Sequence, residues 1–218
     1  MNIVFLFCLF SLTVSGLDSL TFLKEFCLHP QEVGAIAATS SYTGNELCYF
    51  LSSQERGDKG LRILEIGGGF GNVSEIISGY MKDNDVLDIV EINPEFCEKI
   101  KKRVGNKQNI SVQCCSILDW NPVEKYDCII STLPFNAFSY IFFEDVFNHI
   151  CSLGTTDVVF SYVEYLGLGK VRDVFTFNKD VQMIKKFLHK QHRDKKVRVE
   201  TVWLNLPPLQ VYHLKINE

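Results

Sequence analysis

From residue 61 onward, short apolar runs alternate with stretches in which apolar side chains recur with the period of a helix. The alternation predicts strands at 61–66, 86–90, 110–114, 126–130 and 157–162, and helices at 73–80, 94–104, 140–151 and 181–189. Strands that alternate with helices form a mainly parallel sheet with helices on both faces. The pattern therefore predicts an α/β fold.

The end of the chain departs from this alternation. Two strand-like runs, 197–204 and 209–216, are joined only by a short Asn-Leu-Pro-Pro connection. Because so short a connection cannot contain a crossover helix, the two strands must be antiparallel. A mainly parallel, seven-stranded sheet with a C-terminal antiparallel hairpin is typical of the Rossmann-like class I methyltransferase fold rather than of a dehydrogenase.

We place this domain at residues 56–218 and expect a helical extension at 17–55 before it. Apolar side chains between residues 20 and 28 recur with helical spacing until Pro30, and Thr39-Ser40-Ser41 offers an N-cap for a second helix. Residues 1–16 form a separate apolar segment, which is too short to span a bilayer comfortably, since that takes about 20 apolar residues. A membrane-surface or buried helix, a secretory signal and a misassigned start all remain open for it.

Composition narrows the class of protein. A hydrophobic content of 46% with 22% charged residues describes a globular chain with an ample core. The formal net charge of −4 gives no general attraction to nucleic acid. The eight cysteines include no C-x-x-C pair, and several lie within apolar runs, which is typical of buried thiols in a reducing compartment. We therefore expect no metal site and no disulfide framework.

The glycine-rich segment Glu65-Ile66-Gly67-Gly68-Gly69-Phe70-Gly71 follows the first strand and opens the first helix. Glycines at 67, 69 and 71 permit positive φ angles and a close approach of a ligand to the backbone. A dinucleotide site has its third glycine one position later. The tighter spacing, preceded by an acidic residue, resembles the first motif of S-adenosylmethionine-dependent enzymes. This resemblance implies that Glu65 lies near the amino-acid end of the cofactor.

Glu91 ends the second strand, twenty residues after Gly71. A carboxylate at a strand tip can accept hydrogen bonds from both ribose hydroxyls, and the following Ile92 would then pack on the adenine. This fold usually presents an acidic residue to the adenine amino group after the third strand. The present sequence has Ser116 there and Asp119 only later, so one of these two is expected to contact the adenine.

Further segments resemble bacterial phospholipid N-methyltransferases. Residues 22–41 are similar to that family's N-terminal helix and its V-G-A-I-x-P-S-S stretch. Residues 131–135, Ser-Thr-Leu-Pro-Phe, are similar to its S-G-L-P segment, and residues 202–212 are close to its terminal W-x-N-L-P-P-A-x-V-Y. The sequence departs from the family in having Thr132 for glycine and Ala38 for proline.

The resemblance implies methyl transfer to the amine of phosphatidylethanolamine by a cytoplasmic protein that is peripheral at the membrane. A methylated amine is a cation that favours aromatic faces. Before each transfer, the acceptor amine must lose a proton to a nearby group. Phe135, Tyr162 and Glu164 are the candidates for the acceptor site. Ser131, at the tip of the fourth strand, is assigned to both the acceptor and the cofactor.

Other functions remain open. The fold and first motif also resemble ribosomal RNA adenine dimethyltransferases, but those have Asn-x-Pro-Tyr/Phe where this chain has Ser131-Thr-Leu-Pro-Phe. The chain also lacks the basic surplus and the C-terminal helical domain that RNA binding would favour. Methylation of a small molecule or a protein, and a degenerate cofactor-binding module without activity, are further alternatives. The sequence does not indicate an oligomeric state.

Overall fold

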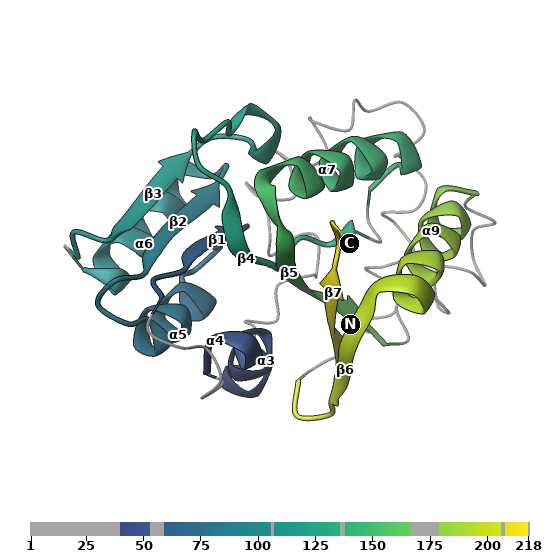
Figure 1. Cartoon of the computed structure of the whole chain (residues 1–218), viewed down its shortest axis with the longest axis horizontal. Helices are drawn as coiled ribbons and strands as arrows, with labels where there is room; N and C mark the ends of the chain where they lie inside the picture. The colour runs from purple at the N-terminus through teal and green to yellow at the C-terminus, as the bar shows by residue number, and fades with distance from the viewer. Residues whose placement is uncertain are drawn as a thin grey trace, which may run out of the picture.

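The computed structural model describes residues 40–52, 59–105, 107–135, 138–166, 179–205 and 208–217. Within them the chain forms a seven-stranded sheet in the order β3-β2-β1-β4-β5-β7-β6 (Figure 1). Neighbours among β1 to β5 pair in parallel, whereas β7 is antiparallel to both β5 and β6. The predicted α/β sheet with a terminal antiparallel hairpin is confirmed. The strands are β1 (Arg62–Ile66), β2 (Val86–Glu91), β3 (Ile110–Cys114), β4 (Tyr126–Ser131), β5 (Gly154–Tyr165), β6 (Lys196–Val202) and β7 (Leu209–Lys215).

Helices cover both faces of this sheet, and each face has its own apolar core. One core joins the sheet to α3 (Ser41–Leu47), α4 (Tyr49–Ser52), α5 (Asn72–Tyr80) and α6 (Pro94–Val104). The other joins it to the short helix η2 (Ile117–Asp119), α7 (Tyr140–Leu153) and α9 (Lys179–Lys195), and it is rich in phenylalanine. Two buried faces explain why the central strands read as nearly continuous apolar runs.

Several elements extend further than the pattern predicts. β2 includes Glu91 and β4 includes Ser131, because each pairs with a neighbouring parallel strand at that position. β5 continues to Tyr165, which pairs with Leu209 of β7. Helix α9 ends at Lys195, six residues later than expected. The apolar spacing that predicts this helix ends at Leu188, but beyond it the His192 ring stacks on Tyr212 of the sheet.

The first described residues are hydrogen-bonded to the connection between β6 and β7. The Ser40 hydroxyl accepts a hydrogen bond from the backbone N–H of Thr43 at 3.3 Å, which makes it the predicted N-cap of α3. The buried side chain of Asn205 accepts from the Ser40 N–H at 3.1 Å and from the Thr43 hydroxyl at 3.2 Å. The segments 22–41 and 202–212, which both resemble phospholipid N-methyltransferases, therefore meet at Ser40 and Asn205.

The expected segment 1–16 lies outside the described residues, as do residues 17–39 and 53–55 of the expected extension 17–55. In the part of the chain that the structure does describe, no helix combines the length and the apolar character needed to cross a membrane.

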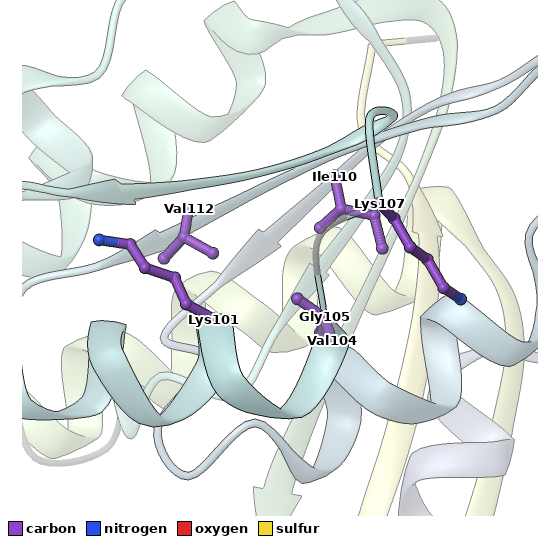
Figure 2. A pocket seen from close by; sticks show the side chains of 6 residues that line it. All are labelled: Lys101, Val104, Gly105, Lys107, Ile110 and Val112. Atoms are coloured by element: carbon purple, nitrogen blue, oxygen red, sulfur yellow. The ribbon is translucent and has the colours of Figure 1, made fainter.

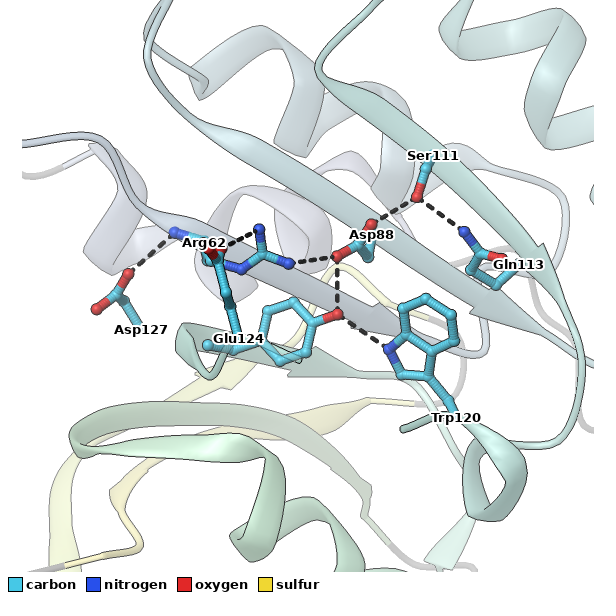
Figure 3. Close-up of polar contacts among 8 residues, drawn as sticks. Arg62, Asp88, Ser111, Gln113, Trp120, Glu124 and Asp127 are labelled. Carbon is cyan, nitrogen blue, oxygen red and sulfur yellow. Dashed lines mark hydrogen bonds and ion pairs between the residues drawn. The ribbon is translucent and has the colours of Figure 1, made fainter. Parts of the chain in front are cut away.

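A buried polar network joins β1, β2 and β4 to Trp120, which follows η2 (Figure 3). Asp88, in the middle of β2, accepts hydrogen bonds from the Arg62 guanidinium at 3.1 Å and from the Tyr126 hydroxyl at 2.8 Å. The indole N–H of Trp120 in turn donates to the Tyr126 hydroxyl at 2.9 Å. Because Asp88 is 7% exposed, its negative charge is held mainly by these partners rather than by water.

Candidate functional site

The glycine-rich turn lies between β1 and α5, at the carboxyl end of the parallel strands. Gly67, Gly69 and Gly71 have φ angles of +77°, +53° and +80°, a region that side chains disfavour. The N–H of Gly67 donates to the carbonyl of Val90 on β2 at 2.9 Å, and Gly71 caps α5. The turn therefore crosses the tips of β1 and β2 with its backbone close to both.

Gly68 is part of the same turn for a different reason, which the motif spacing did not show. A Cβ atom at this position would lie 2.8 Å from Ile100 Cδ1 and 2.9 Å from Ile89 Cγ2. Glycine is required here because the turn packs directly on α6 and β2. The run of three consecutive glycines was the available signal.

Glu91 lies at the tip of β2, as the sequence indicated, and holds the turn in place. One carboxyl oxygen accepts from the Gly69 N–H at 2.9 Å and the other from the Asn93 N–H at 2.8 Å. Burial raises the pKa of Glu91, although these two backbone donors lower it in part. Each carboxylate oxygen can accept a second hydrogen bond, so the group can also bind a diol. Ile92 beside it is half-buried.

Glu65 is a buried acid with an unusual lack of partners. Its side chain is 0% exposed, and neither carboxyl oxygen has a hydrogen-bond partner among the residues that the structure describes. Burial raises its pKa to about 7. The nearby Ser74 hydroxyl lowers the pKa, and the Glu91 carboxylate raises it further. A buried polar group without partners calls for an explanation. A cationic group delivered by a ligand at the glycine turn would satisfy it.

We expect this acid to make stability depend on pH. Its folded pKa of about 7 exceeds the ordinary value of 4.5, so the folded state holds an extra proton between these values. That contribution to stability is complete below the unfolded pKa and is lost as the pH rises through about 7. Urea denaturation of the ligand-free protein should show a loss of about 2–3 kcal/mol between pH 5 and pH 8 that Glu65→Gln removes. Parallel stability curves for the two proteins would contradict the assignment.

The end of β3 gives no acidic side chain to the site. Ser116 is buried, and its hydroxyl accepts from the Leu118 N–H at 3.3 Å, which caps η2. Asp119 lies in η2 with an exposed side chain. Of the two residues considered for the adenine, Ser116 is thus the one that stands at the strand end.

The segment after β4 packs on the glycine turn. The Thr132 hydroxyl donates to the carbonyl of Gly67 at 2.7 Å, and its backbone N–H donates to the carbonyl of Ile66 at 3.2 Å. The buried Ser131 hydroxyl accepts from the Leu133 N–H at 3.2 Å. Thr132, noted in the sequence only as a departure from a glycine, therefore links the segment to the turn.

Phe135 lies inside an aromatic core rather than on an open face. Its ring is 2% exposed. Its neighbours are Phe138, Phe143, Phe160 and Tyr162, with ring centroids 5.5 to 6.3 Å away. The ring has no free face toward a methylated cation in this arrangement, so its evident role is to pack the segment after β4 against α7.

Tyr162 and Glu164, both on β5, come together with a residue that the sequence did not single out. The Tyr162 hydroxyl donates to a Glu164 carboxyl oxygen at 3.0 Å and is hydrogen-bonded to Nε2 of His192 on α9. The His192 ring stacks on Tyr212 of β7, with centroids 3.9 Å apart and planes within 8°. No spacing rule connects α9 with β5, so only the folded structure reveals this cluster.

A surface hollow of about 370 Å³ lies elsewhere, between α6 and the edge strand β3 (Figure 2). Its lining contains none of the predicted site residues; the lining residues are Lys101, Val104, Gly105, Lys107, Ile110 and Val112. The amino groups of both lysines have partners, Glu98 for Lys101 and Ser78 for Lys107. Across the described ranges, no group of three or more potential metal ligands is present.

Comparison with known proteins gives a family. The profile of the family described as nodulation protein S (NodS) matches residues 34–149, more than half of the 218 residues. Among solved structures, the N-methyltransferase NodS from Bradyrhizobium japonicum WM9, in complex with S-adenosyl-L-homocysteine, superposes with a TM-score of 0.64. It is 12% identical in sequence, and the match covers 90% of this chain and 98% of that one. At such identity, the superposition shows a shared fold.

Two curated proteins extend the comparison. Malonyl-[acyl-carrier protein] O-methyltransferase 1 of Ilyobacter polytropus is 32% identical over 98 residues, which cover 44% of this chain and 34% of that protein. An ornithine lipid N-methyltransferase of Singulisphaera acidiphila is 21% identical over 137 residues, 60% of this chain and 69% of that one. The chain spans about a third of the length of the malonyl O-methyltransferases that it matches.

Proposed function

Since the chain belongs to the NodS family of S-adenosylmethionine-dependent methyltransferases, we propose that it transfers methyl groups from this cofactor to the amine of a membrane lipid, with phosphatidylethanolamine as the first candidate. The observation that carries the cofactor part of the proposal is the pair of buried acids at the glycine turn: Glu65, which has no hydrogen-bond partner within the described ranges, and Glu91 at the strand tip.

The residues present fit the cofactor. The ionised form of Glu65 would hold the ammonium group of the methionine portion, which gives the buried acid the partner it lacks. Glu91 would accept from the two ribose hydroxyls, with Ile92 on the adenine and Ser116 at its edge. Gly67, Gly69 and Gly71 would let the cofactor approach the backbone. Ser131 would help to position the segment between the cofactor and the acceptor.

The bound cofactor supplies an electrophilic methyl group on a sulfonium, so the protein contributes mainly orientation. Thr132 joins the acceptor side to the cofactor side through its bond to Gly67. Tyr162 and Glu164 stand at the same edge of the sheet, one strand further along. These residues would hold an amine in line with the methyl group and exclude water from it.

A lipid acceptor is supported by three observations. The segments around residues 33–41, 131–135 and 202–212 are similar to phospholipid N-methyltransferases, and an ornithine lipid N-methyltransferase is among the relatives. At the tip of the β6–β7 hairpin, Trp203 and Leu204 are 72% and 69% exposed. Exposed Trp and Leu side chains are suited to the interface of a membrane. We therefore propose that the protein acts at a membrane surface, as a peripheral protein.

The acceptor can be identified by following the label. The purified full-length protein is incubated with methyl-labelled S-adenosylmethionine and, separately, with vesicles of phosphatidylethanolamine, vesicles of ornithine lipid, ribosomal subunits and malonyl-[acyl-carrier protein]. We expect label in the lipid extract of the phosphatidylethanolamine vesicles, and chromatography then counts the methyl groups. Phosphatidylcholine vesicles, which lack a free amine, are the negative control.

The other arms define the result that would reject a lipid acceptor. Label in ribosomal RNA or in malonyl-[acyl-carrier protein], with none in either lipid, would replace the proposed substrate. Label in ornithine lipid alone would keep the chemistry and change the headgroup.

A further inference from the structure

Three polar side chains form a continuous hydrogen-bonded chain beside the end of β5. Tyr162, which is fully buried, donates its only hydroxyl proton to Glu164 at 3.0 Å. Nε2 of His192 contacts the same hydroxyl oxygen and lies 3.5 Å from the Glu164 carboxyl. None of these three side chains is hydrogen-bonded to the glycine turn, so binding of the cofactor does not explain why they are joined.

The order of donors in this chain can be assigned. Burial lowers the pKa of His192 to about 4, so its imidazole is neutral at pH 7 and has one N–H. Because the Tyr162 proton is donated to Glu164, the Nε2 atom of His192 must donate to the Tyr162 oxygen. The stacking on Tyr212 holds the imidazole plane in the orientation that this bond needs. The chain therefore runs from His192 through Tyr162 and ends on the Glu164 carboxyl.

That carboxyl lies at the acceptor side of the site and is accessible. Tyr162 is the Cα partner of Ser131, the last residue of β4, and the next residue, Thr132, bonds to the glycine turn. Glu164 follows two residues later on the same face of β5. Its side chain is 34% exposed, whereas Tyr162 is not exposed. Glu164 is thus the member of the chain that a substrate can reach.

We infer that Glu164 accepts the proton of the acceptor's ammonium group, and that His192 positions the carboxylate for this step through Tyr162. The inference rests on the proposed function and deepens it, since it requires an acceptor that arrives as a cationic amine.

The proton balance of the step is simple. The ammonium group of the acceptor gives one proton to the Glu164 carboxylate and becomes a neutral amine. The amine nitrogen then forms a bond to the methyl carbon with its lone pair, while the carbon–sulfur bond breaks and its electron pair stays on sulfur. The products are a methylated ammonium group and S-adenosylhomocysteine, and Glu164 releases its proton to solvent.

The charged groups around the chain suit this role. Burial raises the pKa of Glu164, which makes it a stronger base, while the Tyr162 hydrogen bond and Lys185 on α9 lower it. Tyr212 on β7 lies against the His192 ring and near the Glu164 carboxylate. Its own pKa is raised to about 12, so its hydroxyl stays neutral. Lys196 at the start of β6 and His189 on α9 both keep His192 neutral.

The test compares pH profiles of kcat/KM for methylation of phosphatidylethanolamine vesicles between pH 6 and 9. Glu164→Gln should lose at least about 100-fold at pH 7, because base catalysis contributes about 10²–10⁴-fold. The loss should shrink about tenfold per pH unit, since solvent then deprotonates the amine. Glu200→Gln, an exposed glutamate on β6, should leave the profile unchanged.

His192 is tested by a matched pair. His192→Phe keeps a ring on Tyr212 but removes the donor, so the acidic limb of the profile should move to higher pH while the affinity for S-adenosylhomocysteine is unchanged. His192→Gln restores a donor and should move the limb back. This pair also decides the case in which Glu164→Gln does not fold.

Two outcomes would count against the inference in different ways. If Glu164→Gln and His192→Phe both methylate the lipid with the unmodified pH profile, the role of Glu164 and His192 is wrong and the proposed function stands. If the unmodified enzyme binds S-adenosylhomocysteine but methylates no amine, the proposed function is wrong and the inference fails with it.

Discussion

Replacing Glu91 with alanine should weaken the binding of S-adenosylhomocysteine at least about 100-fold. The substitution removes the two carboxyl oxygens that we propose as acceptors for the ribose hydroxyls, and hydrogen bonds to a charged group contribute about 1.5–3 kcal/mol each. It also removes the carboxyl oxygen that holds the Gly69 N–H at 2.9 Å, so the glycine turn loses its anchor to β2. Isothermal titration calorimetry measures the affinity directly.

The control for this substitution is Glu98→Ala. Glu98 lies on α6, close in sequence to Glu91, but it is exposed and its carboxylate pairs with Lys101 at 2.9 Å. Its removal should leave the affinity unchanged. An affinity of Glu91→Ala within threefold of the unmodified protein would show that the ribose is held elsewhere.

Replacing Asp88 with alanine should lower the free energy of unfolding by about 3–5 kcal/mol, because it breaks a buried ion pair by removing one partner. The change leaves the Arg62 guanidinium, 3.1 Å from the Asp88 carboxylate, and the buried Tyr126 hydroxyl without their acceptor. The network of Figure 3 would then hold a positive charge with no buried counter-charge. Urea denaturation at pH 7 gives the difference.

Two variants separate this effect from a general loss of surface charge. Glu124→Ala removes the other carboxylate that pairs with Arg62, at 2.9 Å, but Glu124 is 67% exposed and should contribute less than about 1 kcal/mol. Tyr126→Phe removes one neutral hydrogen-bond donor and should cost an intermediate amount, about 1–3 kcal/mol. If Asp88→Ala costs no more than Glu124→Ala, the network is not a source of stability.

The order of strands and helices could be predicted from the sequence because the central strands are buried on both faces and therefore have few polar interruptions. The exceptions are informative. Asp88 interrupts the second strand, yet nothing in the spacing identifies its partner Tyr126, 38 residues away. The true end of α9 cannot be predicted either, because its last turns contain no apolar residue after Leu188 and one of their contacts with the sheet is that of His192 with Tyr212.

The proposed cofactor side of the site follows from local spacing, since Gly67, Gly71 and Glu91 are fixed by one turn and one strand tip. The acceptor side does not. Its Leu-Pro-Phe turn makes Phe135 a candidate for the acceptor site, but four aromatic rings from β5, α7 and the segment just before α7 enclose it. His192 lies on α9 and contacts Tyr162 of β5, and this contact depends on how α9 packs across the sheet. Long-range packing, rather than sequence pattern, decides such contacts.

The bonds of Asn205 to Ser40 and Thr43 have a consequence for the order in which the protein is completed. The Ser40 N–H and its acceptor are separated by 165 residues. A ribosome makes the first of these residues long before the second, since chains grow at roughly 5–20 residues per second. The anchor of α3 therefore forms only after the turn between β6 and β7 has been synthesised. A truncation before Asn205 would remove that anchor from a helix that precedes the whole sheet in the sequence.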